Sequence, residues 1–380
     1  MGPMPAQPDL RPDVSALPIP REGVAGAAPY GAPQLEVAHA LNVNENPYGP
    51  SPELAAAIGR AAAEAATTLN RYPDREALDL RADLGEYLAA ESHIPAPPPE
   101  QVWAANGSNE VMHQLLLAYG GPGRTALGFT PHYSMYPEYA RDTYTAWVTA
   151  ERGPAPDFTL DAAAVTAAIA EHDPGVVVLT SPNNPTGTAL DLEVVRAAAQ
   201  ALAPRRGLLV VDEAYGEFRR DGVPSALTLL LTTPNLVVTR TMSKAFALAG
   251  ARLGYLVAHQ DIVDALRVVR LPYHLSAVTQ VVARTALAHR KELLGTVALL
   301  RRERDALAEH LIQRGHDVAP SDANFVLFRS FADRQHVFEQ LLARGVLIRV
   351  VGPDGWLRVS VGTEEDNIAF RTALQEADPR

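Results

Sequence analysis

Through the middle of this chain, short apolar runs alternate with stretches that have the apolar spacing of helices. Runs that are apolar at nearly every position favour strands buried on both faces, and strands separated by helices favour a parallel sheet. We therefore predict an α/β fold in which helices cover a largely parallel sheet. The predicted strands span residues 101–105, 125–129, 176–180, 208–211 and 236–239, and one predicted helix spans 109–119.

The pattern is different before this region. Residues 1–34 are rich in proline and glycine and carry little periodic apolar pattern, which is typical of an extended arm. Two helices are predicted after the arm, one at 52–66, where Ser51 is a suitable N-terminal cap, and one at 75–90. We place a large first domain at residues 35–270.

Beyond residue 270 the pattern favours a smaller α+β domain at residues 271–380, to which part of the N-terminal segment contributes. A long helical stretch at 279–314 comes first, and its charged run at 301–304 predicts a solvated helix face. Strands are predicted at 324–329, 346–351 and 356–361, followed by a final helix.

Composition narrows the class of protein. The 380 residues are 47% apolar and 20% charged, which is enough for one large core or two domains. The net charge of −11 argues against a nucleic-acid partner, because phosphates would repel the protein. The lack of cysteine excludes disulfides and cysteine nucleophiles. Neither a secretory signal nor an apolar run of membrane-spanning length is visible, so we expect a cytoplasmic protein without a membrane partner.

The clearest chemistry lies around Lys244. Small and apolar residues dominate its segment, 241–252, and a lysine in a desolvated pocket loses its proton easily and becomes a nucleophile toward aldehydes. Thr241, Ser243 and Arg252 are donors suited to holding a phosphate beside that aldehyde.

Asp212 adds a carboxylate to this set. It ends the apolar run 207–212, where a buried strand would deliver it to an edge of the sheet. A lysine, a carboxylate and a phosphate clamp together suit pyridoxal 5′-phosphate, which needs a Schiff base with the lysine and a partner for its ring nitrogen. The sequence therefore predicts an enzyme that uses this cofactor.

Several segments in a fixed order carry a resemblance to a known family. They are Leu-Asn-Val-Asn-Glu-Asn-Pro-Tyr at 41–48, Arg-Tyr-Pro-Asp at 71–74, Asn-Gly-Ser-Asn-Glu at 106–110, Ser-Pro-Asn-Asn-Pro-Thr-Gly at 181–187, and the aspartate and lysine segments above. The chain resembles the fold-type I pyridoxal-phosphate aminotransferases, and most closely those that act on histidinol phosphate. The resemblance implies a large domain with a mostly parallel seven-stranded sheet between helices, plus the smaller α+β domain.

The resemblance also implies roles for the matching residues. Lys244 would form the Schiff base and move the proton during transfer, and Asp212 would pair with the ring nitrogen. Tyr215 and Asn184 would hydrogen-bond the phenolic oxygen of the cofactor, and Tyr133 would stack on its ring. The phosphate would be held at a helix start and after a strand by Gly107, Ser108, Asn109, Thr241, Ser243 and Arg252.

Other matches concern the substrate and a second subunit. In the family, the tyrosine that matches Tyr72 reaches the cofactor phosphate of the neighbouring subunit, which implies a homodimer with shared active sites. Arg358 matches the arginine that receives an anionic substrate group, and Arg349 is a second candidate for that role. Tyr30 and Tyr273 are candidates for the substrate wall.

These implications lead to a function and leave alternatives open. The expected reaction moves an amino group between histidinol phosphate and 2-oxoglutarate in histidine biosynthesis. An aminotransferase for aromatic amino acids, or a pyridoxal-phosphate decarboxylase of an O-phosphorylated amino acid, would share the cofactor residues. An effector module of a transcription factor would need a basic DNA-binding domain, which residues 1–34 are too short to supply. The histidines lack His-Glu-x-x-His spacing, so no metal is expected, and we expect His274 to be structural.

Overall fold

The computed structural model describes residues 17–329 and 333–378. The chain divides into a unit of residues 1–33 and a unit of residues 34–380. In the first unit, the described residues 17–33 form turns, with a hydrogen bond from Val24 N to Arg21 O (3.1 Å). The rest of the predicted arm, residues 1–16, lies outside the described residues. All helices and strands named below belong to the second unit.

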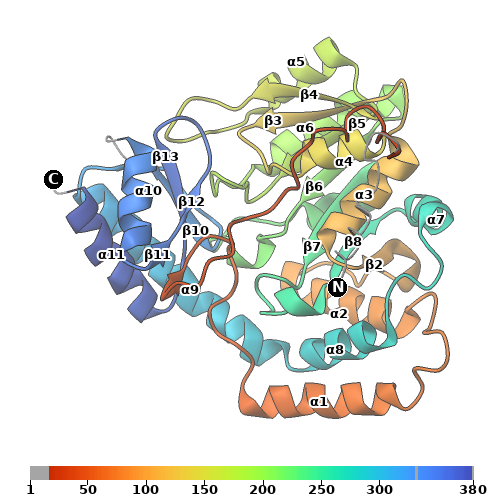
Figure 1. Ribbon diagram of the computed structural model, residues 1–380. Coiled ribbons are helices and arrows are strands. Elements are labelled where there is room, and N and C mark those ends of the chain that lie inside the picture. Colours follow the sequence, from red (N-terminus) through yellow and green to blue (C-terminus); the bar gives the residue numbers. More distant parts are fainter. Residues whose placement is uncertain (1–16, 330–332, 379–380) are drawn as a thin grey trace, which may run out of the picture. The chain divides into compact units, whose positions relative to one another are not determined.

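A seven-stranded sheet forms the centre of the second unit (Figure 1). Every neighbouring pair of strands is parallel except the two pairs that β8 makes with β2 and β7. The expected mostly parallel sheet is therefore confirmed. In spatial order its strands are β2 (Val102–Ala105), β8 (Gly254–Ala258), β7 (Leu236–Thr241), β6 (Leu208–Asp212), β5 (Val176–Thr180), β3 (Thr125–Thr130) and β4 (Ala146–Glu151).

Helices cover both faces of this sheet because successive strand residues point to opposite sides. In β6, Leu208 and Val210 pack with one group of helices, and Leu209 and Val211 pack with the other. The first group comprises α3 (Ser108–Tyr119), α4 (Tyr136–Asp142) and α7 (Gln260–Val269). The second group comprises α2 (Leu78–Ser92), α5 (Ala162–His172), α6 (Leu192–Leu202) and α8 (Ala277–Ala288).

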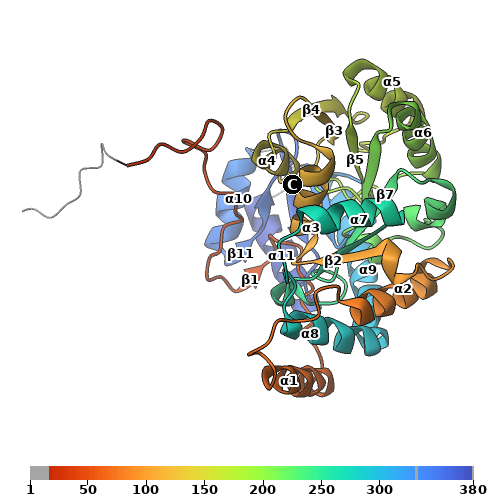
Figure 2. The same ribbon diagram turned by 90° about the vertical axis from the view of Figure 1, so that its right-hand side faces the viewer.

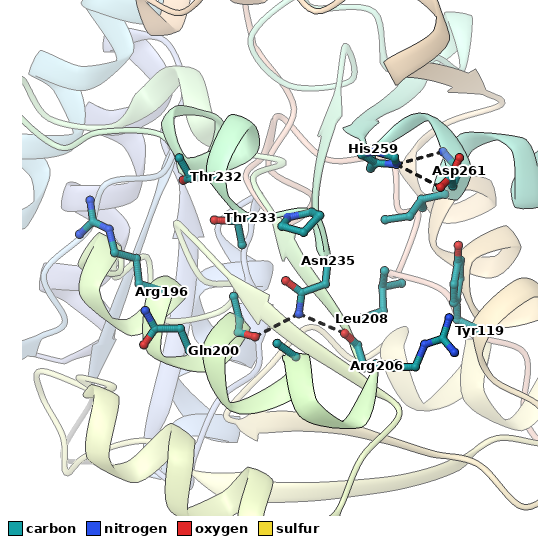
Figure 3. Close-up of a pocket in the computed structure, with 15 residues that line it drawn as sticks. Tyr119, Arg196, Gln200, Arg206, Leu208, Thr232, Thr233, Asn235, His259 and Asp261 are labelled. Atoms are coloured by element: carbon teal, nitrogen blue, oxygen red, sulfur yellow. Dashed lines mark hydrogen bonds and ion pairs between the residues drawn. The ribbon is translucent and has the colours of Figure 1, made fainter.

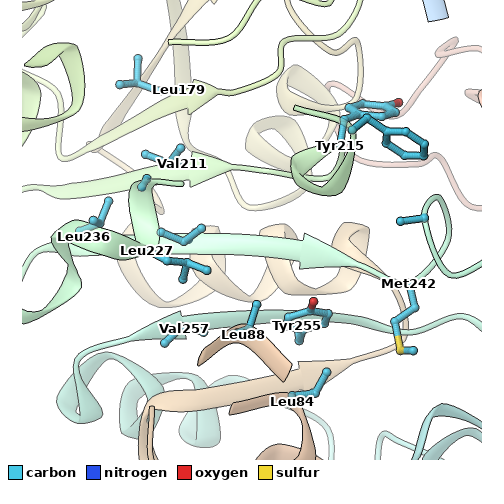
Figure 4. Close-up of a cluster of buried hydrophobic side chains, with 14 of the residues drawn as sticks. Leu84, Leu88, Leu179, Val211, Tyr215, Leu227, Leu236, Met242, Tyr255 and Val257 are labelled. Carbon is cyan, nitrogen blue, oxygen red and sulfur yellow. The ribbon is translucent and has the colours of Figure 1, made fainter. Parts of the chain in front are cut away.

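Figure 4 shows part of the second core, where Leu179, Val211 and Val257 of three strands lie in one cluster with Leu84 and Leu88 of α2. Each fully buried side chain of this kind contributes roughly 1.5–3 kcal/mol through burial. Helix α1 (Pro52–Ala66) lies along α8 (Figure 2). Short 3₁₀ turns occur at Pro99–Gln101, Ala203–Arg205, Gly216–Phe218, Ala226–Thr232 and Ala249–Ala251.

The C-terminal region forms a second, antiparallel sheet with its own core. Its strands, in order, are β12 (Arg349–Val350), β13 (Trp356–Ser360), β10 (Phe325–Arg329) and β9 (Asp317–Val318). Three helices pack on it: α9 (Arg290–Gln313), α10 (Arg334–Ala343) and α11 (Glu364–Ala377). A separate parallel pair joins β1 (His39–Ala40) to β11 (Val346–Leu347). The division of the chain into domains at residue 270 stays a prediction.

Local contacts change two helix predictions and confirm a third. Helix α2 begins at Leu78 and not at 75, because Asp74 accepts hydrogen bonds from Glu76 N and Leu78 N (both 3.0 Å) and Ala77 is left-handed at φ +47°. The predicted helix at 279–314 is two helices, α8 and α9, because the backbone at His289 leaves the helical conformation (φ −103°, ψ 17°). The prediction for 52–66 is confirmed, and Ser51 Oγ accepts from Leu54 N (3.1 Å).

Two other predictions are wrong for tertiary reasons. The predicted strand 346–351 is split, because β11 pairs with β1 whereas β12 pairs with β13 in a different sheet. The charged run 301–304 is not wholly solvated, since Arg304 is fully buried and its Nη1 donates to Phe218 O (2.9 Å). Helical spacing aligns Arg304 with the buried Leu300 and Leu307. Among the described residues, no helix combines the length and apolarity needed to cross a membrane.

Candidate active site

Lys244 follows the C-terminal end of β7 and points toward the segment that precedes α1. Its Nζ donates to Val43 O (3.0 Å). Burial lowers the pKa of Lys244 from 10.5 to about 8, the cations of Arg358 and Arg252 act in the same direction, and Glu45 opposes them. The lowered pKa increases the fraction of Lys244 that is a neutral amine near neutral pH, and the neutral amine is the form that attacks an aldehyde.

Asp212 ends β6, on the strand next to the one that leads to Lys244. The carboxylate is 6% exposed and accepts from Tyr136 Oη (2.8 Å), Thr239 Oγ1 (3.0 Å) and Ala214 N (3.1 Å). Burial raises the pKa of Asp212, and the hydrogen bonds from Tyr136 and Thr239 oppose that change. A carboxylate held in this way by neutral donors suits a cationic partner such as a protonated ring nitrogen.

A buried ion pair holds the loop that follows Asp212. Arg240 of β7 donates through Nε to Glu213 Oε2 (2.9 Å) and through Nη1 to Glu217 Oε1 (3.0 Å). Gly216 lies against this guanidinium, since a Cβ added there would be 2.6 Å from the Arg240 Cζ. The two glutamates flank Tyr215, so Arg240 restrains the loop on both sides of that residue.

Tyr215 and Asn184 are both buried, and both contact side chains of the C-terminal sheet. Tyr215 Oη accepts from Asn44 Nδ2 (3.0 Å), and its ring packs edge-on against Phe325 of β10 at 5.1 Å between centroids. Asn184 Oδ1 accepts from Arg358 Nη1 (2.6 Å). The structure thus brings these two side chains to the elements that carry Arg358.

The residues predicted to bind phosphate gather where α3 begins. Gly107 caps the helix at φ +85°, and a Cβ added there would be 2.6 Å from Arg252 Nη2. A side chain at Gly254, opposite Thr241 in the sheet, would collide with the backbone of Ser108. The start of α3, which includes Asn109, therefore lies close to β8 and to Arg252.

Next to this helix start, Thr241 Oγ1 donates to Ser243 Oγ (3.1 Å) and accepts from Ser243 N (3.2 Å). Backbone N–H groups at a helix start, hydroxyls and a guanidinium together form a set of donors that fits a phosphate dianion. This set fits the phosphate of the predicted cofactor, as Lys244 fits its aldehyde and Asp212 its ring nitrogen.

Arg358 and Arg349 lie on neighbouring strands of the C-terminal sheet. Arg358 is buried, its Nη2 donates to Asn42 O (2.8 Å), and its guanidinium lies 5.1 Å from the ring centroid of Phe325. Arg349 is half-buried on β12 and is the register partner of Arg358. The two predicted anion-binding residues are therefore adjacent.

The aromatic candidates are placed differently. Tyr133 is half-buried and packs edge-on against Tyr136 at 5.6 Å between centroids. Tyr72 and Tyr273 stack on each other at 4.3 Å and are 78% and 39% exposed, so Tyr273 faces Tyr72. Tyr30 belongs to the unit of residues 1–33, and its role stays a prediction.

His274 has the structural role that we expected. Its Nε2 is hydrogen-bonded to Ala104 O (2.9 Å), and its ring stacks on Trp103 at 5.2 Å. Its carbonyl accepts from Asn106 Nδ2 (2.7 Å). These contacts hold the 273–275 segment against the start of α3.

Sequence reasoning assigned no role to three residues that contact the candidate groups. Tyr136 donates to Asp212, Asn44 donates to Tyr215, and Arg240 restrains the loop of Tyr215. Asn44 lies in the segment 41–48, which carries part of the resemblance, and Tyr136 lies three residues after Tyr133. A signal for Arg240 was available, because an arginine inside an otherwise buried strand needs acidic partners.

A cavity of about 700 Å³ lies at the opposite edge of the sheet (Figure 3). Leu208 and Asn235, at the N-terminal ends of β6 and β7, line it. Asp212 is at the other end of β6, and Lys244 follows the C-terminal end of β7. Asn235 Nδ2 is already bonded to Ala199 O (3.1 Å). This cavity is therefore separate from the candidate active site.

Comparisons with known proteins agree with this geometry. Residues 39–374 match the family model for aminotransferase class I and II. Histidinol-phosphate aminotransferase of Thermobifida fusca (strain YX) is 61% identical over 367 residues, which are 97% of this chain and 97% of that protein. The crystal structure of histidinol-phosphate aminotransferase from Sinorhizobium meliloti in complex with pyridoxal-5′-phosphate is similar with a TM-score of 0.80 and 26% identity, and covers 90% of this chain and 92% of that chain.

Aspartate aminotransferase from Thermus thermophilus with maleate is also similar, with a TM-score of 0.77, 28% identity, and coverage of 90% of this chain and 92% of that chain. The expected fold type and the expected cofactor, pyridoxal 5′-phosphate, are confirmed by this family assignment. The chain belongs to the class I and II aminotransferases and, within them, to the histidinol-phosphate aminotransferase family.

Proposed function

We propose that the protein transfers the amino group of histidinol phosphate to 2-oxoglutarate, forming imidazole acetol phosphate and glutamate, as a step of histidine biosynthesis in the cytoplasm. The observation that carries the proposal is that Arg349 and Arg358 are adjacent on the C-terminal sheet. This sheet lies close to Lys244, because Arg358 donates to Asn42 O and Lys244 donates to Val43 O. Two guanidiniums suit a phosphate dianion in one half-reaction and the carboxylates of glutamate in the other.

The bound cofactor supplies an electron sink for the carbanion that forms when the substrate loses its α-proton. Lys244 would hold the aldehyde carbon and then carry the proton, because its pKa of about 8 lets the amine accept and return a proton near neutral pH. Asp212 would keep the ring nitrogen protonated, and Tyr136 and Thr239 would keep Asp212 in place. Tyr215 and Asn184 would bind the phenolic oxygen.

Recognition of the cofactor phosphate is assigned to the donors near the start of α3. Backbone N–H groups after Gly107 and the positive end of the helix would meet the dianion, and Arg252 would neutralise part of its charge. The side chains that complete this set are Ser108, Asn109, Thr241 and Ser243. Tyr133 would cover the ring.

We also propose that the active form is a homodimer. Tyr72 and Tyr273 form an exposed aromatic stack, and Leu69, Val268 and Leu271 beside them in sequence are more than half exposed. The two segments lie together, since Arg270 Nη1 donates to Arg75 O (2.6 Å). A second copy of the chain would cover this surface and bring Tyr72 to the cofactor phosphate of its partner.

The decisive experiment compares amino donors with 2-oxoglutarate as acceptor. Histidinol phosphate should give a higher kcat/KM than phenylalanine, tyrosine or histidine, and no carbon dioxide should evolve. Faster turnover of phenylalanine would favour an aminotransferase of aromatic amino acids. Carbon dioxide release without need for a 2-oxo acid would indicate a decarboxylase.

A further inference from the structure

Asn44 occupies a restrained position in the segment before α1. Its backbone is left-handed at φ +55°, a conformation that asparagine, aspartate and glycine adopt more easily than other residues, and the residue is 1% exposed. Asn324 Nδ2 donates to Asn44 O (3.1 Å). The backbone of Asn44 is therefore held independently of its side chain.

The side-chain amide of Asn44 has a defined direction. Ser360 Oγ accepts from Asn44 N (2.9 Å) and donates its own proton to Asn44 Oδ1 (2.8 Å). With Oδ1 engaged by Ser360, Nδ2 points the other way and donates to Tyr215 Oη (3.0 Å). An N–H that donates to a hydroxyl occupies one of its lone pairs, so the hydroxyl proton must be directed elsewhere.

We propose that Asn44 is a positioning residue that commits the Tyr215 hydroxyl to donate toward the phenolic oxygen of the cofactor. This inference rests on the role of Tyr215 in the proposed function. An amide that can only donate at this point prevents the tyrosine from donating back to the segment of residues 42–44. The Tyr215 hydroxyl would then face the cofactor with its proton already directed at the phenolic oxygen.

The segment of residues 42–44 is also hydrogen-bonded to β13, the strand that carries Arg358. Ser360 and Arg358 are two residues apart on β13 and therefore point to the same face. Arg358 is bonded to Asn42 O, and Ser360 is bonded to Asn44. The position of the Asn44 amide is thus set by the strand that carries the proposed anion-binding arginine.

The test measures the pH midpoint of the visible absorbance change of the cofactor-loaded protein, which reports the proton on the bond between Lys244 and the cofactor. A donor on the phenolic oxygen stabilises its negative charge and lowers this midpoint. Asn44→Gly keeps the left-handed backbone and removes the amide, so the midpoint should rise by about one pH unit. Asn44→Asp turns the donor into an acceptor that takes the tyrosine proton, so its midpoint should rise at least as far.

Tyr215→Phe provides the matched background. It should raise the midpoint by itself, and adding Asn44→Gly to it should produce no further shift, because the amide acts through the hydroxyl. Arg358, Arg252 and Glu45, the other charges that act on Lys244, are unchanged in Asn44→Gly and Tyr215→Phe. Asn44→Asp adds a carboxylate close to Lys244, so the comparison of Asn44→Gly in the two backgrounds decides the test. Circular dichroism and melting of each variant check that it is folded.

The outcomes separate the inference from the function on which it rests. If Tyr215→Phe shifts the midpoint but neither Asn44 variant does, Asn44 has no positioning role. An equal shift from Asn44→Gly in the wild-type and Tyr215→Phe backgrounds would show that Asn44 acts by another route, which also overturns the inference. If Tyr215→Phe has no effect, the role of Tyr215 fails, and the inference fails with it, while turnover of histidinol phosphate still tests the reaction.

Discussion

Arg349 and Arg358 are register partners on antiparallel strands, so their side chains leave the same face of the C-terminal sheet. Like charges directly opposite each other in such a pair are destabilising. Arg358 offsets part of this cost through Asn184 and Asn42, whereas Arg349 makes no hydrogen bond or ion pair that the structure records with a described residue. An anion bound between the two guanidiniums would neutralise both.

This relationship predicts different effects at the two positions. Arg358→Lys keeps the charge and loses the planar, bidentate donor, so kcat/KM should fall by about one to two decades for both histidinol phosphate and glutamate. Arg349→Ala should reduce kcat/KM for histidinol phosphate more than for phenylalanine, which carries no second anion. Steady-state kinetics with the three amino donors measures both effects.

The control for these variants is Arg344→Ala. Arg344 is exposed, is paired with Glu376 at 2.9 Å, and lies outside the candidate site, so its loss should leave all three kcat/KM values unchanged. Equal losses for histidinol phosphate and phenylalanine in Arg349→Ala would remove that arginine from phosphate recognition.

Lys244 should carry the cofactor covalently. Protein loaded with pyridoxal phosphate should absorb visible light, lose the band on borohydride reduction, and yield one labelled peptide with the label on Lys244. Lys244→Ala should still bind the cofactor through the phosphate donors but lack the reducible bond. Mass spectrometry of the digest locates the label, and a label on Lys291, the only other lysine of the chain, would disprove the assignment.

The variant Asp212→Asn tests whether the carboxylate is needed for turnover or only for the stability of the fold. The amide keeps the shape of the side chain but removes the charge that holds the ring nitrogen protonated, so turnover should fall by about two or more orders of magnitude. Melting should change less, because the amide oxygen at the Oδ1 position can still accept from Thr239 Oγ1 and Ala214 N. At the Oδ2 position, Tyr136 Oη can donate to Thr180 Oγ1 and accept from the new amide N–H. Near-normal turnover at saturating cofactor would mean that the carboxylate serves only to hold the fold.

The lowered pKa of Lys244 predicts that the free energy of unfolding of the cofactor-free protein depends on pH. Between the folded pKa of about 8 and the ordinary 10.5, the unfolded chain binds more protons, so the free energy of unfolding should rise with pH. Lys244→Met removes this term. The cofactor-free variant should be more stable than the wild type by about 3 kcal/mol at about pH 7, and the difference should shrink toward pH 10. Denaturant unfolding at both pH values measures it, and a constant difference would contradict the assigned cause.

Shared active sites predict complementation between two impaired chains. If Tyr72 serves the partner's phosphate, a heterodimer of Lys244→Ala and Tyr72→Phe chains places both lesions in one site and leaves the other site intact. Activity should return on mixing, up to one working site per heterodimer. Absence of recovery despite demonstrated subunit exchange would place Tyr72 within its own subunit's site or outside it.

Local patterns in the sequence were sufficient for much of the large sheet and its helices. Ser51 and the helical pattern of apolar residues that follows it predicted α1. Unbroken apolar runs predicted β3, β5, β6 and β7, because a strand that is buried on both faces needs apolar residues at every position. Strand β8 is equally apolar, yet only its antiparallel pairing between β2 and β7 identifies its place. The direction of a strand is decided by contacts that are distant in sequence.

The candidate site also has features that the sequence predicted and features that only the tertiary structure revealed. Lys244, Asp212 and the donors Thr241, Ser243 and Arg252 were enough to indicate the cofactor, because a Schiff-base lysine, a partner for the ring nitrogen and a phosphate clamp suit it. The class of reaction and the role of Arg358 were indicated by the resemblance of several segments in a fixed order. That Arg349 lies opposite Arg358 and that Asn44 donates to Tyr215 depended on the tertiary structure. Segments 171 residues apart, as 44 and 215 are, meet only when the two sheets have packed, and no local pattern encodes which hydrogen-bonding groups then face each other.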